Sequence, residues 1–174
     1  MHIRKAQAQD IPAISRIFDD IHTAEEAGTV TIGWNRSIYP TRATAESALE
    51  RDDLFVQESE GEIVGSAIIN QIQVDVYADG AWQYPAEDAE VMVLHTLVIS
   101  PRAAGKGFGS SFVAYYEALA RARGCRVLRM DTNARNSTAR ALYRRLGYRE
   151  ADIVPCTFNG LANVQLVLLE KKLS

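Results

Sequence analysis

Residues Val91–Val113 read VMVLHTLVISPRAAGKGFGSSFV, and this stretch has three parts. Val91–Ile99 is an apolar run rich in β-branched residues, which predicts a buried strand. Gly105–Gly109 contains three glycines and predicts a tight turn, and apolar residues spaced three and four apart after it predict a helix. Because the first N–H groups of a helix lack internal partners, such a strand, turn and helix can bind an anion.

The glycine spacing excludes the two commonest nucleotide motifs. No glycine stands four residues before a Gly-Lys-Ser/Thr triplet, so the P-loop pattern fails. The glycines run G-x-G-x-G, which also departs from the dinucleotide fingerprint G-x-G-x-x-G, and a nicotinamide-dependent oxidoreductase is disfavoured. A turn with a purely structural role remains an alternative at this point.

Length and composition describe an ordinary globular chain. Its 174 residues are expected to form one domain, 1–174, and the net charge of -3 gives no sign of nucleic acid as a partner. No apolar run approaches the roughly 20 residues of a membrane span, and no apolar signal core follows the N-terminus. The two cysteines, Cys125 and Cys156, are too few for a disulfide framework. We therefore expect a cytoplasmic protein without membrane contact, and the sequence suggests no metal site.

The order of elements predicts a mixed α/β sheet flanked by helices. Helices are expected after Asp10, from Thr41 or Thr44 to about Arg51, after the glycine turn and after Asn136. The expected strands are Ile3–Ala6, Leu54–Glu58, Ile63–Gln71, Val91–Ile99, Arg126–Met130, Ile153–Phe158 and Val164–Leu169, with an extension at Val74–Tyr77. Asp131–Arg135 is expected to be a polar connection. A strand-helix-strand unit implies parallel pairing and the hairpins imply antiparallel pairing.

The segment that begins at Asn136 reads NSTARALYRRLGY and predicts a capped helix. Asn136 is a suitable N-cap and Gly147 a suitable residue just past the C-terminus. Ala139, Leu142 and Tyr143 fall on one helical face.

Two motifs together resemble the GNAT family of N-acetyltransferases. Leu97–Pro101 followed by Gly105–Gly109 is similar to that family's motif A, and Asn136–Tyr148 is similar to its motif B. The order of elements also fits the family fold, a central mixed and mostly antiparallel sheet flanked by helices, over most of the chain. One departure is Ala104, where the family usually has Arg or Gln; Arg102 or Lys106 is expected to supply the missing positive charge.

The resemblance implies acetyl-CoA as the cofactor. The glycine-turn amides and the helix N-terminus would cradle the pyrophosphate, and the pantetheine arm would pair with Leu97–Ile99 where a bulge near Leu97-Val98 spreads the strands. The Val98 N–H is expected to stabilise the thioester oxyanion. The cofactor-binding residues implied in this way are Leu97, Val98, Ile99, Arg102, Gly105, Lys106, Gly107, Phe108, Gly109, Ser110, Asn136 and Tyr143.

The resemblance also assigns the proton transfers. Tyr143 is the expected general acid for the leaving thiolate, although its spacing also suits a plain apolar face. His95 is the leading candidate for the base, since alternation would place Val93, His95 and Leu97 on one face of the strand. The alternatives are a buried neutral histidine, Glu90 as the base, or a chain of water molecules.

The implied function is transfer of an acetyl group from acetyl-CoA to a primary amine of a small molecule, amino acid or peptide, by direct attack in a ternary complex. Trp34, Tyr39, Trp82 and Tyr84 are the candidate walls of the acceptor pocket. The alternative is a non-catalytic acyl-CoA-binding or regulatory domain of the same fold. The apolar end strands are compatible with a homodimer.

Overall fold

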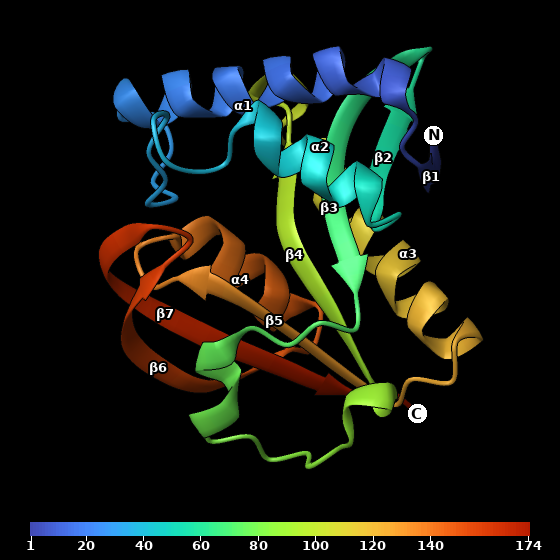
Figure 1. Ribbon diagram of the computed structural model, residues 1–174, viewed down its shortest axis with the longest axis vertical. Helices are drawn as coiled ribbons and strands as arrows, with labels where there is room; N and C mark the ends of the chain where they lie inside the picture. Colours follow the sequence, from blue (N-terminus) through green and yellow to red (C-terminus); the bar gives the residue numbers. More distant parts are fainter.

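The computed structural model describes all residues, 1–174, and is organised around one seven-stranded sheet. Its strand order is β1-β2-β3-β4-β5-β7-β6, so the last strand of the chain lies inside the sheet (Figure 1). Only β4 and β5 pair in parallel; the other neighbours are antiparallel. The strands are β1 His2–Lys5, β2 Leu54–Ser59, β3 Glu62–Asn70, β4 Val91–Ile99, β5 Val127–Asn133, β6 Arg149–Phe158 and β7 Leu161–Lys172.

Four α-helices cover the sheet, two on each face. They are α1 Ile11–Glu26, α2 Arg42–Glu50, α3 Phe108–Ala122 and α4 Ser137–Arg145. Helices α1 and α2 pack together over β2 and β3, whereas α3 and α4 share a core with the opposite face of the sheet (Figure 1). Four short 3-10 helices complete the chain: η1 Ala8–Asp10, η2 Asp75–Asp79, η3 Asp88–Glu90 and η4 Pro101–Ala103.

The long connection from β3 to β4 covers the part of the sheet that no α-helix reaches. Tyr77, 1% exposed, packs there on apolar residues of β4, β5 and β7. Arg129 of β5 lies 4.2 Å from the centre of the Trp82 ring and donates a hydrogen bond to the Tyr84 carbonyl. Glu170 of β7 is fully buried and accepts hydrogen bonds from the Gln83 and Tyr84 amides, so the connection is fixed to the sheet at several points.

A bulge in β4 divides this strand into two halves. The register against β3 shifts between the pairs Ser66–Val98 and Ile68–His95, so that two residues of β4 stand opposite Ala67. One of them, Thr96, has a φ of 49°, which is rare for a β-branched residue. Because the extra residue changes the alternation, Leu94 and Leu97 both face the core beneath α3, and His95 faces away from it.

Most of the predicted elements are confirmed. The strand Val91–Ile99 has the predicted bounds, the helix after Asn136 has the predicted cap, and the closing hairpin turns at Asn159-Gly160. Two predictions are wrong. Val74–Tyr77 does not extend the sheet, because η2 curls at this point and buries Tyr77. Asp131 does not open a polar connection, because β5 continues to Asn133 by pairing with β7.

No helix of the protein combines the length and the apolar character that crossing a membrane requires.

Candidate active site

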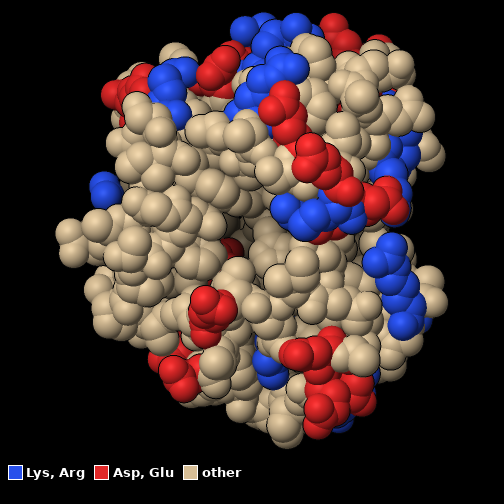
Figure 2. All heavy atoms as spheres, in the orientation of Figure 1, with Lys and Arg blue, Asp and Glu red and all other residues tan.

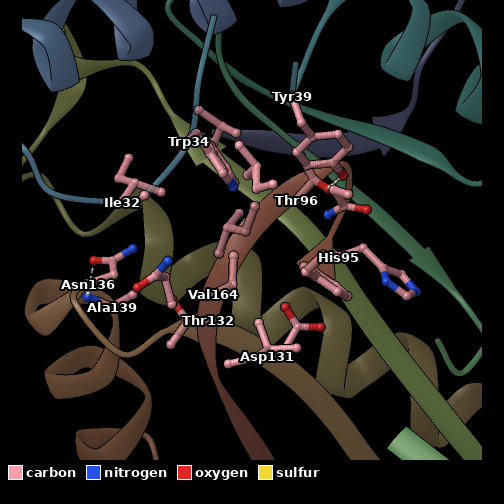
Figure 3. Close-up of a pocket in the computed structure, with 18 of the residues that line it drawn as sticks. Ile32, Trp34, Tyr39, His95, Thr96, Asp131, Thr132, Asn136, Ala139 and Val164 are labelled. Atoms are coloured by element: carbon pink, nitrogen blue, oxygen red, sulfur yellow. Dashed lines mark hydrogen bonds between the residues drawn. The ribbon is translucent and has the colours of Figure 1, made fainter. Parts of the chain in front are cut away.

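The site lies where β4 and β5 separate. The two strands pair only from Val91 to Leu94 and from Val127 to Met130, and beyond these residues the sheet opens. A cavity of about 170 Å³ occupies the opening, lined by 22 residues from both sides of the gap (Figure 3). Figure 2 shows a hollow in this face of the molecule with acidic atoms on its floor, and Asp131 is the only Asp or Glu that lines the cavity.

The glycine turn lies at the N-terminus of α3, as predicted. Gly105 and Gly107 have φ values of 77° and 80°, and a Cβ added to either would meet nothing within 4 Å. The glycines are therefore required by the backbone conformation and not by packing, and the surface above them is open. The first helical hydrogen bond joins Ser111 N to Gly107 O, so the N–H groups of Phe108, Gly109 and Ser110 are left without helical partners.

The backbone of β4 beyond the bulge presents a free edge to the gap. Ser100 N donates to Val64 O across to β3, and antiparallel alternation then makes Val98–Ser66 the next hydrogen-bonded pair. The Val98 N–H consequently points to β3 and does not face the gap, contrary to the role expected for it. The N–H and C=O of Ile99 point the other way, into the space that β5 has left. Ile99 is thus the better placed of the two to pair with an extended ligand.

Asn136 and Tyr143 come from α4 and both line the cavity. The Asn136 side chain accepts a hydrogen bond from Ala139 N at 3.1 Å, so its role as an N-cap is confirmed. Tyr143 is 7% exposed, and burial together with the charge of Asp131 raises the pKa of its hydroxyl. A phenol of this kind stays protonated at neutral pH and can donate a proton.

Asp131 is the one acidic group in the cavity, and the sequence reasoning did not assign it a role. Its Oδ2 accepts a hydrogen bond from the Tyr77 hydroxyl at 2.5 Å, and its other oxygen is left for the cavity. Burial raises the pKa of this carboxyl to about 6, with the hydrogen bond from Tyr77 acting in the opposite direction. Such a carboxyl is charged at pH 7 and is close enough to neutrality to accept a proton. A signal was present in the sequence: an acidic residue directly follows the predicted strand Arg126–Met130.

His95 has a different setting from the one expected. Its Nε2 lies 2.8 Å from Oδ1 of Asn70 on β3, and its ring points away from the carboxylate of Asp131 (Figure 3). Burial lowers the pKa of its imidazole to about 4, so the ring is neutral at pH 7 and is a weak base. The expected alternation fails because the bulge places Leu97 on the opposite face from Val93. The arrangement matches the alternative of a buried neutral histidine.

The structure brings two of the four candidate pocket aromatics to the cavity. Trp34 and Tyr39 line it and pack edge to face, with ring centres 6.1 Å apart. The Tyr39 hydroxyl is hydrogen-bonded to the hydroxyl of Thr96 in the bulge, which fixes this loop to β4. Trp82 and Tyr84 instead belong to the β3–β4 connection and do not line the cavity.

The remaining candidates lie outside the cavity. Glu90 forms an ion pair with Arg126 at 2.6 Å, and this partner lowers the pKa of its carboxyl. A carboxylate that is held in an ion pair and has a lowered pKa is a poor proton acceptor, so Glu90 is not a suitable base. Arg102 lies beside the glycine turn with its Nε 3.4 Å from Oδ2 of Asp20 on α1, and its side chain is 84% exposed. Arg102 would have to leave Asp20 to approach an anion at the turn, which its exposed side chain allows, and Lys106 has no ion-pair partner.

Comparison with known proteins identifies the fold and the motifs. The chain matches the Acetyltransferase (GNAT) family over residues 13–148. It belongs to this family. The family uses acetyl-CoA as its cofactor and acts as acyltransferases on amines. The predicted family and fold class are thus confirmed.

Individual relatives are distant. An uncharacterized N-acetyltransferase of Methanocaldococcus jannaschii is 29% identical over 105 residues, which are 60% of this chain and 42% of that protein. The chain therefore spans about two fifths of this curated relative. A GNAT-family acetyltransferase from Streptococcus agalactiae superimposes with a TM-score of 0.81 at 22% identity, covering 99% of this chain and 95% of that one. A Salmonella typhimurium protein solved with its cofactor acetyl-CoA superimposes with a TM-score of 0.69 at 18% identity, covering 100% of this chain and 94% of that one. These structural likenesses show the fold.

The GNAT cofactor fits the residues that are present. The open turn at Gly105 and Gly107 and the unpaired N–H groups at the start of α3 suit a pyrophosphate. The free edge of β4 at Ile99 suits an amide-bearing arm, and the arm would lead toward Tyr143 in the cavity.

Proposed function

We propose that this GNAT protein transfers an acetyl group from acetyl-CoA to the primary amine of a small molecule, amino acid or peptide, by direct attack in a ternary complex. The observation that supports the proposal is the meeting of Asp131 and Tyr143 in one cavity, beside a free strand edge and an open glycine turn. Acetyl-CoA, when bound, supplies the activated acetyl thioester. Residues of this chain would bind the two substrates and transfer the protons.

Asp131 replaces His95 as the proposed base. An alkyl ammonium has a pKa of about 10.4 and must lose a proton before it can attack. The free oxygen of Asp131 first pairs with the ammonium and then accepts its proton, either directly or through one water molecule. Tyr77 holds the other oxygen, so the carboxylate keeps a fixed orientation.

Tyr143 is the proposed acid. Tyr143 lines the cavity on the side of α4, and the raised pKa of its hydroxyl keeps the proton in place until a stronger base than water develops beside it. The departing sulfur is such a base, and Tyr143 Oη would donate its proton there as the C–S bond breaks. The second proton that the attacking nitrogen loses as the amide forms would return to Tyr143. Arg102, Lys106, Phe108, Gly109 and Ser110 are proposed to hold the phosphates, and Leu97–Ile99 with Asn136 the arm.

An amine-panel assay that reads free thiol tests the proposal. Acetyl-CoA is mixed with the protein and with arylalkylamines, aliphatic amines, amino acids and short peptides, and thiol release above the rate without acceptor is expected for at least one class. The same preparation is heated with and without acetyl-CoA, since a ligand that binds the native state raises the melting temperature. A melting shift without thiol release across the whole panel would argue for the non-catalytic alternative.

A further inference from the structure

The acceptor side of the cavity has a single charge. Among its 22 lining residues, Asp131 is acidic, none is Lys or Arg, and the one histidine, His95, turns its ring toward Asn70. Two arginines near the cavity are engaged elsewhere. Arg51 pairs with Asp53, and Arg36 of the loop over the cavity pairs with Glu26. No group in the cavity can therefore neutralise an anion carried by the acceptor.

The apolar part of the wall around Asp131 comes from three parts of the fold, while threonine and asparagine side chains line much of the rest. The loop before α2 contributes Trp34 and Tyr39, the connection after β3 contributes Val74, and the β6–β7 hairpin contributes Phe158 and Leu161. These apolar side chains can pack against an apolar body, and the neutral polar side chains beside them can hydrogen-bond to an acceptor but cannot neutralise a charge. An apolar cavity of roughly 150 Å³ accepts one benzene-sized ring. The present cavity, of about 170 Å³, would also take the end of the acetyl-CoA arm, so the buried part of an acceptor is limited to at most one ring or a short branched chain.

Two contacts narrow one side of the cavity. A Cβ added to Gly160 in the hairpin turn would lie 3.0 Å from the Ile38 side chain, so the loop and the turn are packed together. A Cβ added to Gly33 would lie 2.3 Å from the Asn133 side chain, so the same loop also sits tightly on the end of β5. On this side of the cavity an extended polypeptide has less room than a small molecule has. The geometry therefore favours a small molecule over a protein.

We propose, on the basis of the function proposed above, that the acceptor is a small amine without a carboxylate, whose ammonium group pairs with Asp131 and whose apolar or aromatic body packs against Trp34, Tyr39 and Phe158. A free amino acid is disfavoured for a definite reason. Its α-carboxylate is two bonds from its amine, so it would enter the cavity beside Asp131 with no cation to pair with. Two like charges about 5 Å apart repel by several times the thermal energy, even at an effective dielectric constant of about 20.

Matched acceptors test the role of the carboxylate. Phenethylamine, phenylalanine amide and phenylalanine share one body and differ at the α-carbon by a hydrogen, a neutral amide and a carboxylate. The value of kcat/KM is expected to be roughly tenfold or more higher for phenethylamine than for phenylalanine, with the neutral amide between them. Equal or better use of phenylalanine would overturn the inference. A higher kcat/KM for a tripeptide with phenylalanine at its N-terminus than for phenethylamine would overturn the inference in favour of a peptide acceptor.

A binding measurement separates this inference from the proposed reaction. Phenethylamine is expected to raise the melting temperature of the wild-type protein at pH 7.5, and Asp131→Asn is expected to abolish most of that rise. Asp79→Asn removes an exposed carboxylate outside the cavity and is expected to leave the rise unchanged. If no acceptor releases thiol but the rise still depends on Asp131, the reaction is wrong and the acceptor class stands. If thiol is released equally with all three acceptors, the proposed reaction stands and the proposed acceptor class is wrong. If phenethylamine does not raise the melting temperature of the wild-type protein, that result also counts against the acceptor class.

Discussion

Asp131 and Tyr143 approach each other only because β4 and β5 separate between them. Asp131 faces the side of the sheet that carries Tyr77, whereas Tyr143 descends from α4 on the other side. In an unbroken sheet the strands would lie between these two groups. The gap brings a carboxylate and a phenol with raised pKa values into one cavity, and such perturbed groups in a cleft are typical of functional sites.

Asp131→Asn is expected to lower kcat/KM by about 10² to 10⁴ and to remove the acidic limb of the pH–rate profile. The wild-type limb should have a midpoint near the Asp131 pKa of about 6. The other titratable groups whose pKa values are affected by the Asp131 charge are Tyr39, Tyr77, Tyr143 and Cys156; all four are neutral near pH 6 and do not contribute a limb. His95→Gln serves as the control and should keep the limb. Persistence of the limb in Asp131→Asn would contradict the assignment.

The same substitution is expected to stabilise the protein. The pKa of Asp131 is about 6 in the folded state against 3.8 normally, so the folded state binds the proton more tightly and stability falls as the pH rises from about 4 to about 6. Asparagine removes that charge and keeps an acceptor for Tyr77. At pH 7 we expect a gain of roughly 1 to 3 kcal/mol in the free energy of unfolding, and little gain at pH 4. Urea unfolding at the two pH values measures it, and an equal effect at both would count against a buried charge.

Tyr143→Phe is expected to lower kcat by about 10²-fold, because the variant keeps the apolar face of α4 but loses the proton donor. Tyr143 is 7% exposed and packs edge to face on Tyr148, so the ring must stay to preserve the core. Binding of acetyl-CoA, measured by calorimetry, should change little. A variant with unchanged turnover would remove Tyr143 from the proposed mechanism.

Among the elements, the sequence predicted most of what local chemistry determines. The strand Val91–Ile99, the glycine turn and the cap at Asn136 follow from β-branched residues, backbone freedom and a side-chain acceptor. A bulge near Leu97-Val98 was expected and lies within one or two residues of that position. Its consequence for His95 could not be predicted, because a mostly apolar strand does not show where the alternation of its side chains shifts by one residue.

Gly107→Ala tests the turn as an element. Gly107 has a φ of 80° with open space around it, so alanine there imposes backbone strain of about 1 to 2 kcal/mol and no clash. Because the strain relaxes by turning the first amides of α3, we expect weaker binding of acetyl-CoA in addition to the lower stability. Gly124→Ala is a matched control at the other end of α3, with a φ of 74° and equally open surroundings. Gly124→Ala should lower the stability about as much as Gly107→Ala does, without weakening the binding of acetyl-CoA. If the two variants lose the same affinity for acetyl-CoA, the glycine turn has no specific role in binding it.

In the whole molecule, the site depends on a segment that the sequence could not place. The connection between β3 and β4 is polar and aromatic, and Trp82 and Tyr84 suggested a pocket wall. The structure uses both to fasten this connection to the sheet through Arg129 and Glu170. Long-range contacts of this kind, between residues more than 40 positions apart, leave no periodic signal in the sequence. Through Tyr77 the connection reaches the floor of the cavity from the face opposite α4.

Tyr77→Phe tests whether this distant segment tunes the proposed base. The Tyr77 hydroxyl stabilises the charged form of Asp131, and its hydrogen bond lowers the pKa of that carboxyl against the larger effect of burial. Removing the hydroxyl should therefore move the acidic limb of the pH–rate profile to higher pH, while kcat/KM on the plateau above the limb falls only modestly. The phenylalanine ring keeps the packing on β4 and β5, so a merely structural role would lower the melting temperature without moving the limb. Trp82→Phe, which disturbs the same connection without touching Asp131, should leave the limb at its wild-type position.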